Sequence, residues 1–145
     1  MTATTTATTT DTNPVPLTPQ VMLDTAWKWF ITEGHKLSVT LDENDNHFVL
    51  WYRHPDGVLR CNLGLFISDD VYVPEMEGQD ILGPMSRFFP RTCMLFVNFP
   101  AQFLRKFTRV HDFTAVTCHN PDDVNICMRR GFGALVSEFG LALPE

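Results

Sequence analysis

The sequence lacks the patterns by which most enzymes and membrane proteins are first identified. It has no glycine-rich phosphate-binding loop, no GxSxG nucleophile motif and no HExxH zinc motif. No stretch approaches the roughly 18 consecutive apolar residues that a membrane-spanning helix needs. Positive charge is also scarce, since the 145 residues carry a formal net charge of −6 and the pI is about 5.2. This balance argues against a general attraction to nucleic acid or to an anionic membrane.

The four cysteines, at positions 61, 93, 118 and 127, lack the CxxC spacing of many zinc and redox sites. Met1 is followed by threonines rather than by the basic and apolar stretches of a signal peptide. We therefore expect a cytoplasmic protein whose thiols are free.

Apolar residues are plentiful enough for one folded domain, with a hydrophobic fraction of 44% and twelve phenylalanines. Residues 1–16 differ from the rest, because seven of the first ten are threonine and Asn13-Pro14-Val15-Pro16 follows. Such a segment has no apolar face to bury. We predict a disordered tail at 1–16 and a single α+β domain at 17–145.

Three segments have the start and stop signals of helices. Apolar spacing and capping residues predict helices from Thr18 to Gly34, from Pro100 through Val110 and from Asn120 to Gly140. Gly131 and Gly133 lie inside the last segment, at a cost of roughly 1 kcal/mol each relative to alanine, which we attribute to close packing.

The strand signals are clearest in the middle of the chain. Alternating and β-prone residues predict strands at Leu37–Leu41, Phe48–Arg53, Val58–Ile67 and Cys93–Val97. His54-Pro55-Asp56-Gly57 predicts a tight turn. A two- or four-residue loop there points Cys61 into the core on the face of Leu50 and Tyr52, whereas a three-residue bulged loop would reverse the pairing, and we favour the first because it gathers the apolar residues. The predicted fold class is α+β, a short hairpin-based antiparallel sheet packed against about three helices.

Cys61, His111 and Asp112 supply the residue types of a cysteine nucleophile, its base and the group that orients the base. Neighbouring side chains diverge on a helix, so we expect Asp112 to orient His111 poorly. The strand pattern also buries Cys61, and buried thiols are usually packing residues. A cysteine-dependent hydrolase using Cys61 and His111 is therefore the alternative interpretation rather than the first.

Metal ligands are present but poorly spaced. The acidic residues within 69–80 lack the alternation and the central glycine of an EF-hand loop. Cys118 and His119 would need Cys93 or Cys127 as a further ligand, and no second close pair completes a zinc site. We expect no metal and no cofactor.

A protein-recognition surface needs no special geometry. Aromatic and arginine side chains, which are enriched in protein interfaces, gather near the turn at 54–57, and carboxylates gather at 69–80. The binding residues that we predict are Arg53, His54, Asp56, Asp69, Asp70, Tyr72, Glu75 and Glu77.

The same stretch carries a sequence motif. Its residues are Tyr52-Arg53, Pro55-Asp56-Gly57, Cys61, Gly64, Ile67, Asp69, Tyr72, Pro74 and Glu77-Gly78, with Glu33-Gly34 upstream and Val110-His111-Asp112 downstream. On these residues the chain resembles a family of small, functionally uncharacterised proteins from bacteria and their phages, over most of residues 21–140. It differs from the usual pattern in having Asn62-Leu63 after the cysteine, and Leu50-Trp51 where a cysteine often precedes the tyrosine.

The small size, the acidity and the missing catalytic motifs favour a non-enzymatic binding or regulatory protein. The resemblance implies no activity, and it suggests a phage-encoded or mobile-element accessory factor that engages a host protein in the host cytoplasm. We therefore predict a protein partner and neither a membrane nor a nucleic acid.

Overall fold

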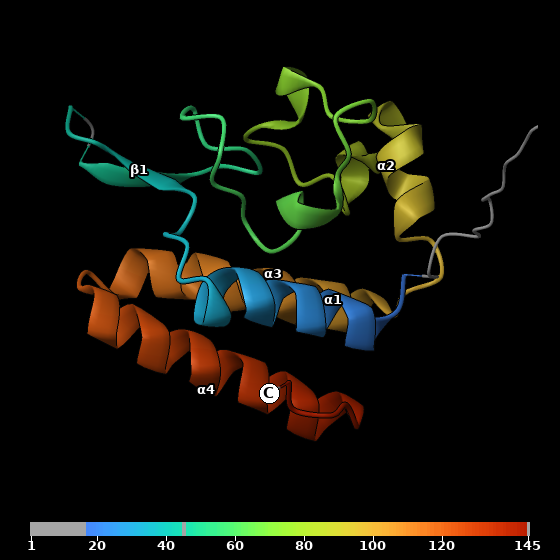
Figure 1. The fold of residues 1–145 in the computed structure, drawn as a ribbon. Helices are drawn as coiled ribbons and strands as arrows, with labels where there is room; N and C mark the ends of the chain where they lie inside the picture. Colours follow the sequence, from blue (N-terminus) through green and yellow to red (C-terminus); the bar gives the residue numbers. More distant parts are fainter. Residues whose placement is uncertain (1–16, 45, 145) are drawn as a thin grey trace, which may run out of the picture.

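The protein folds in two layers in a computed structural model that describes residues 17–44 and 46–144 (Figure 1). The helical layer contains α1 (Pro19–Trp27), α3 (Ala101–Thr117) and α4 (Pro121–Phe139). The second layer contains the antiparallel hairpin of β1 (Val39–Asp42) and β2 (His47–Leu50), irregular segments with short 3-10 turns, and α2 (Pro90–Leu95). This is the predicted α+β fold with a hairpin and three longer helices. The tail predicted at 1–16 lies outside the described residues.

The helix boundaries follow the capping signals. Thr18 accepts a hydrogen bond from the backbone of Val21 at 3.1 Å, and Asn120 accepts one from Asp123 at 2.9 Å. Each side chain thereby satisfies one of the free N–H groups at a helix start. Gly140 ends α4 with φ of 64°, the left-handed conformation that favours glycine. The predicted starts of α1 and α4 and the predicted end of α4 are thus confirmed. α1 is followed by a π-helical turn at Lys28–Thr32, and Gly34, with φ of 70°, ends this helical segment where the sequence predicted.

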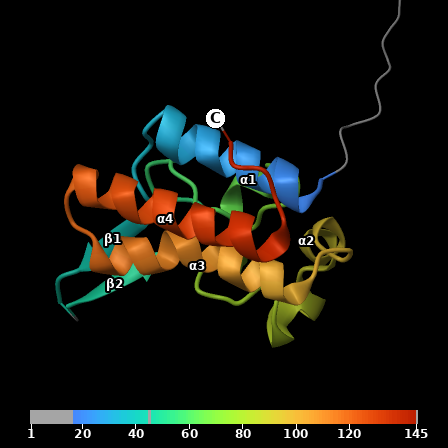
Figure 2. The same ribbon diagram turned by 90° about the horizontal axis from the view of Figure 1, so that it is seen from below.

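The two longest helices pack closely because one glycine lets them approach. A Cβ at Gly131 of α4 would lie only 2.7 Å from Cγ1 of Val110 on α3, whereas one at Gly133 would meet nothing within 4 Å. The expectation of close packing is therefore confirmed at Gly131 alone. An ion pair between Lys106 and Glu138, at 2.6 Å, also joins the two helices. Figure 2 shows α3, α4 and α1 side by side.

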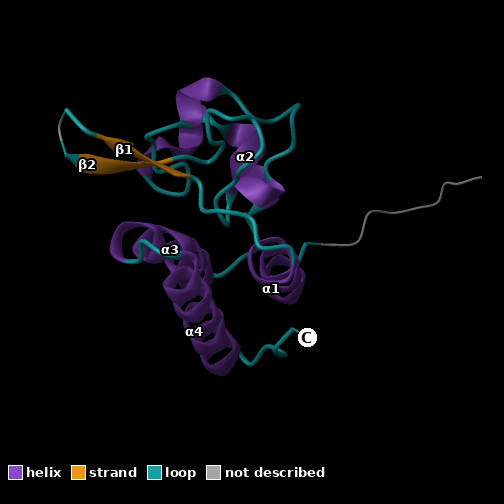
Figure 3. Ribbon diagram, turned by 60° about the vertical axis from the view of Figure 1, so that its left-hand side comes forward, coloured by secondary structure: helices purple, strands orange, loops and turns teal. Residues whose placement is uncertain are grey.

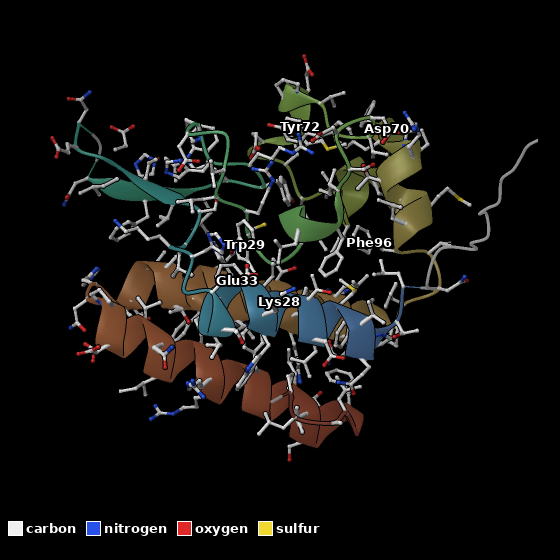
Figure 4. The ribbon with its side chains drawn as sticks, in the orientation of Figure 1. Lys28, Trp29, Glu33, Asp70, Tyr72 and Phe96 are labelled. Carbon is white, nitrogen blue, oxygen red and sulfur yellow. The ribbon has the colours of Figure 1, made fainter. Side chains whose placement is uncertain are left out.

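The hydrophobic core lies between the layers and along the helices. Phenylalanine rings continue from the loop before α3 into that helix, with ring centroids 6.3 Å apart for Phe99 and Phe103 and 5.5 Å apart for Phe103 and Phe107. Phe96 is also buried, and Figure 4 shows it in the space between the layers. Fully buried side chains come from α1, α3, α4 and the irregular segments, and they include Met22, Leu23, Leu63, Met76, Ile81, Phe103, Phe107 and Phe132. This shared core holds the irregular layer in place without a larger sheet.

The strand predicted at 58–67 is wrong. Only an isolated bridge pairs Arg53 with Arg60, and a 3-10 turn follows at Gly64–Phe66. The chain turns here because the buried amide of Asn62 donates to the backbone carbonyl of Phe107 on α3, at 2.6 Å. The predicted orientation is nevertheless correct, since Cys61 is 4% exposed and belongs to the core.

Two other strand predictions also change. Residues 93–97 do not form a strand, because α2 spans Pro90–Leu95 and a short apolar run does not distinguish a strand from a buried helical turn. β2 ends at Leu50 rather than at 53. The backbone N–H groups of Tyr52 and Arg53 donate to a side chain instead of to a neighbouring strand.

Candidate functional site

The carboxylate of Glu77 is the centre of the motif found in the sequence. Its Oε1 accepts from the backbone N–H of Tyr52 at 2.8 Å, and its Oε2 accepts from that of Arg53 at 2.9 Å and from the hydroxyl of Tyr72 at 2.8 Å. One side chain therefore satisfies two backbone donors that the sheet leaves unpaired. Burial, followed by this hydrogen bond, raises the pKa of Tyr72 to about 12.

Arg53 is held on the same side of the molecule. Its guanidinium lies 4.3 Å from the ring centroid of Tyr72, donates to the carbonyl of Ile67 at 2.9 Å and pairs with Asp69 at 2.8 Å. A cation over an aromatic face is favourable, and the stacking fixes both side chains. In Figure 4, Tyr72 and Asp70 lie in the upper part of the irregular layer, away from the three long helices α1, α3 and α4.

Two further motif residues complete this packing. A Cβ at Gly64 would collide with the carbonyl oxygen of Tyr52, so this close crossing of the chain requires glycine. The backbone N–H of Gly64 donates to the sulfur of Cys61 at 3.3 Å. The motif residues thus meet one another in space, and Arg53, Tyr72 and Glu77 bind the protein's own chain.

Cys61 and His111 are both buried, and neither is placed for nucleophilic catalysis. Burial raises the pKa of the Cys61 thiol to about 12, which keeps it protonated. The Nε2 atom of His111 accepts from the backbone N–H of Ser38 at 2.9 Å, so the proton lies on Nδ1, which donates to Asp112 at 2.8 Å. The expectation that Asp112 would diverge from His111 is wrong. Both ring nitrogens are occupied, and the arrangement anchors the start of the hairpin to α3.

The turn at 54–57 is rigid through its own side chains. Asp56 accepts from the backbone N–H groups of Val58 and Leu59 at 2.8 and 3.0 Å, and these bonds lower its pKa. Nδ1 of His54 accepts from the N–H of Asp56 at 3.0 Å. Both predicted binding residues therefore stabilise the turn, although Asp56 is exposed.

The acidic residues at 69–80 differ in what they contact. Asp70 accepts from the hydroxyl of Ser68 at 2.6 Å and pairs with Arg91 at 2.7 Å, and both contacts lower its pKa. Asp69 is 91% exposed but pairs with Arg53. Glu75 is exposed and, within the described part of the chain, forms no hydrogen bond or ion pair. It is the one predicted binding residue with a free carboxylate.

Glu75 lies on a shallow apolar depression that the sequence did not indicate. The depression has a volume of about 460 Å³ and is lined by Val73, Glu75, Gln79, Phe88 and Phe89. Phe88 is 56% exposed and Val73 is 39% exposed, so large apolar side chains face solvent beside an unpaired negative charge. We call these five residues the Phe88 face. The sequence does not identify this face, because it cannot show which of the two neighbouring phenylalanines, Phe88 or the half-buried Phe89, is exposed.

A larger cleft of about 810 Å³ lies below the turn at 54–57. Phe30, Leu37 and Met128 contribute apolar wall, and His54, Asp56 and His119 contribute polar groups. The ring of His119 stacks on Phe48, with centroids 5.8 Å apart. Among residues 17–44 and 46–144, no three His, Cys, Asp or Glu side chains gather in a way that could hold a metal ion.

Comparison with known proteins found no matching family model, no matching curated protein and no matching solved structure. The family resemblance drawn from the motif therefore stays a prediction. Within the described residues, none of the helices combines the length and the apolar character that crossing a bilayer requires.

Proposed function

We propose that the protein acts by binding another protein through the Phe88 face. The observation that carries this proposal is the exposure of Phe88 and Val73 around a depression whose rim bears the unpaired carboxylate of Glu75. Exposed aromatic side chains on a fixed scaffold are typical anchors of protein interfaces. α2 and the 3-10 turn at Pro84–Phe88 support the face from within the irregular layer.

The chemistry of the face defines the partner. The depression is open and shallow, with a volume of about 460 Å³, and its apolar lining can receive side chains of a protein partner. Val73, Phe88 and Phe89 offer apolar contact, and Glu75 offers a negative charge with no partner of its own. The guanidinium of Arg87 lies 4.9 Å from the centroid of the Phe88 ring, so positive charge is already present on that side of the face. The face therefore suits a segment with an aromatic or aliphatic anchor and a lysine or arginine placed on the Glu75 side.

The contacts of Cys61 and His111 support this non-enzymatic proposal over the hydrolase alternative. The thiol is buried and protonated, and the imidazole has no free nitrogen with which to accept its proton. The family resemblance carried by the motif implies that the partner is a host protein. It also implies that the chain is a small acidic accessory or regulatory factor.

The proposal can be tested by site-specific photocrosslinking in a bacterial lysate. Phe88 is replaced by p-benzoylphenylalanine, and the matched control carries the same replacement at Phe113, which is 59% exposed on α3. We expect a discrete crosslinked protein from position 88 alone, and its crosslinked peptide should contain a basic residue beside an apolar one. Reversing the charge of Glu75, which lies on the face and has no partner of its own, should reduce the product. Equal products from positions 88 and 113, or an acidic peptide, would contradict the proposal.

A further inference from the structure

Two thiols from neighbouring helices meet at one end of the helical layer. The sulfur of Cys118, the residue that follows α3, lies 2.8 Å from the sulfur of Cys127 in α4. A covalent disulfide brings two sulfurs to about 2.05 Å, so little movement separates this contact from a bond. Both residues are half-buried and within reach of a small reagent.

The turn between the helices creates this pair. The backbone N–H of Cys118 donates to the carbonyl of Thr114 at 2.9 Å, so the last turn of α3 fixes its position. Asn120 then caps α4, and the chain reverses between the two helices (Figure 3). Cys127 follows about two turns into α4. Cys127 is therefore held within α4, and Cys118, whose own backbone is extended, is held by its hydrogen bond to the last turn of α3.

The other two cysteines lack this arrangement. Cys61 is buried against Gly64, and Cys93 contacts no second thiol among the described residues. The zinc site considered from the sequence would need Cys93 or Cys127 with Cys118 and His119. No such cluster exists in the described part of the chain. The Cys118–Cys127 pair is thus a dithiol without a third ligand.

We propose that Cys118 and Cys127 form an intramolecular disulfide by exchange with a low-molecular-weight disulfide such as oxidised glutathione. One cysteine thiolate attacks a sulfur of the reagent, which forms a mixed disulfide and releases the first glutathione thiolate. The second cysteine loses its proton to solvent and attacks the protein sulfur of the mixed disulfide, which releases the second glutathione. The two cysteines are oxidised, and one glutathione disulfide is reduced to two thiols.

The bond would join the end of α3 to α4 across the turn that bears His119. Cys118 and His119 both line the cleft of about 810 Å³, so oxidation would fix one wall of that cleft. In Figure 1 this turn lies below the hairpin, at the opposite end of the molecule from α2. The Phe88 face is therefore separate, and the disulfide does not depend on the function proposed for that face.

The full-length protein, reduced and then freed of reductant, is incubated without oxygen in glutathione buffers of rising oxidised fraction. Intact mass, thiol count and a digest report the products. We expect the loss of two hydrogens, a linked Cys118–Cys127 peptide and slower amide exchange at residues 118–124. The bridge should form when the oxidised fraction of the glutathione is about tenfold or more lower than the fraction at which Cys93 becomes glutathionylated. The reason is that the second step of bridge formation is intramolecular.

The single variants C118S, C127S and C93S are treated in parallel. C93S should form the bridge as the wild type does, whereas C118S and C127S should carry only mixed disulfides. The proposal is overturned if the wild type keeps a stable mixed disulfide at either position, or if the digest links Cys93 instead. Circular dichroism verifies that each variant is folded, and the wild-type digest decides the question even where a variant is not.

Discussion

The carboxylate of Glu77 should contribute more to stability than any other acidic side chain of its segment. The change Glu77→Ala leaves the N–H groups of Tyr52 and Arg53 and the hydroxyl of Tyr72 without their acceptor. Hydrogen bonds to a charged group contribute about 1.5–3 kcal/mol each, and because water reaches this half-buried site we take about 1 kcal/mol for each donor. The free energy of unfolding should therefore fall by about 3 kcal/mol.

Two further variants make this prediction sharper. Glu77→Gln keeps one acceptor oxygen and should cost about 1–2 kcal/mol, since one backbone N–H loses its partner. Glu75→Ala is the matched control two residues away, and its exposed side chain should change stability by less than about 0.5 kcal/mol. Urea unfolding followed by tryptophan fluorescence measures each value as a shift of the midpoint at unchanged slope. The reasoning is refuted if Glu77→Ala and Glu75→Ala destabilise equally.

Three further outcomes follow from the packing. Gly131→Ala should destabilise the protein because the new Cβ meets Val110, whereas Gly133→Ala should stabilise it by about 1 kcal/mol. Thermal unfolding that ranks the two variants in the opposite order would be contrary evidence. Folding raises the pKa of Cys61 from 9.0 and of Tyr72 from 10.0, each to about 12, so the folded state binds more protons across this range. The stability that these two groups contribute should be fully present below pH 9 and be lost as the pH rises to 12. The loss should be less steep in Tyr72→Phe, and a flat profile in this range would disagree. Finally, Cys61 should resist a thiol reagent at neutral pH until the protein is unfolded, and rapid native labelling at that position would show an accessible thiol instead.

The features that could be predicted from the sequence are those determined by local chemistry. Thr18 and Asn120 cap their helices because side-chain oxygens satisfy nearby N–H groups, and Gly140 ends α4 through its own backbone. The alternation likewise predicted that Cys61 is buried, but it did not predict that Asn62, on the opposite face of the expected strand, is buried as well.

The features that could not be predicted depend on contacts between distant residues. Residues 58–67 alternate like a strand, but Asn62 donates to a helix that begins almost forty residues later. Glu77 is a predicted binding residue because it lies among the carboxylates at 69–80, and its actual partners are the backbone N–H groups of residues 52 and 53 and the hydroxyl of Tyr72. The exposure of Phe88 beside the less exposed Phe89 is also a tertiary property. The motif therefore indicated the right region but not which of its side chains are free.

The most direct test uses the partner segment that crosslinking recovers. Its affinity for four matched variants of the protein is measured by titration calorimetry and compared with its affinity for the wild type. Phe88→Ser should weaken binding about 30-fold, as expected for an interface anchor, and Glu75→Lys should weaken it about tenfold. Phe113→Ser and Glu43→Lys, the same changes at exposed sites on α3 and in the hairpin turn, should alter it by less than about twofold. If all four variants bind as the wild type does, or if the two controls lose as much affinity as the Phe88 and Glu75 variants, the Phe88 face is not the binding surface.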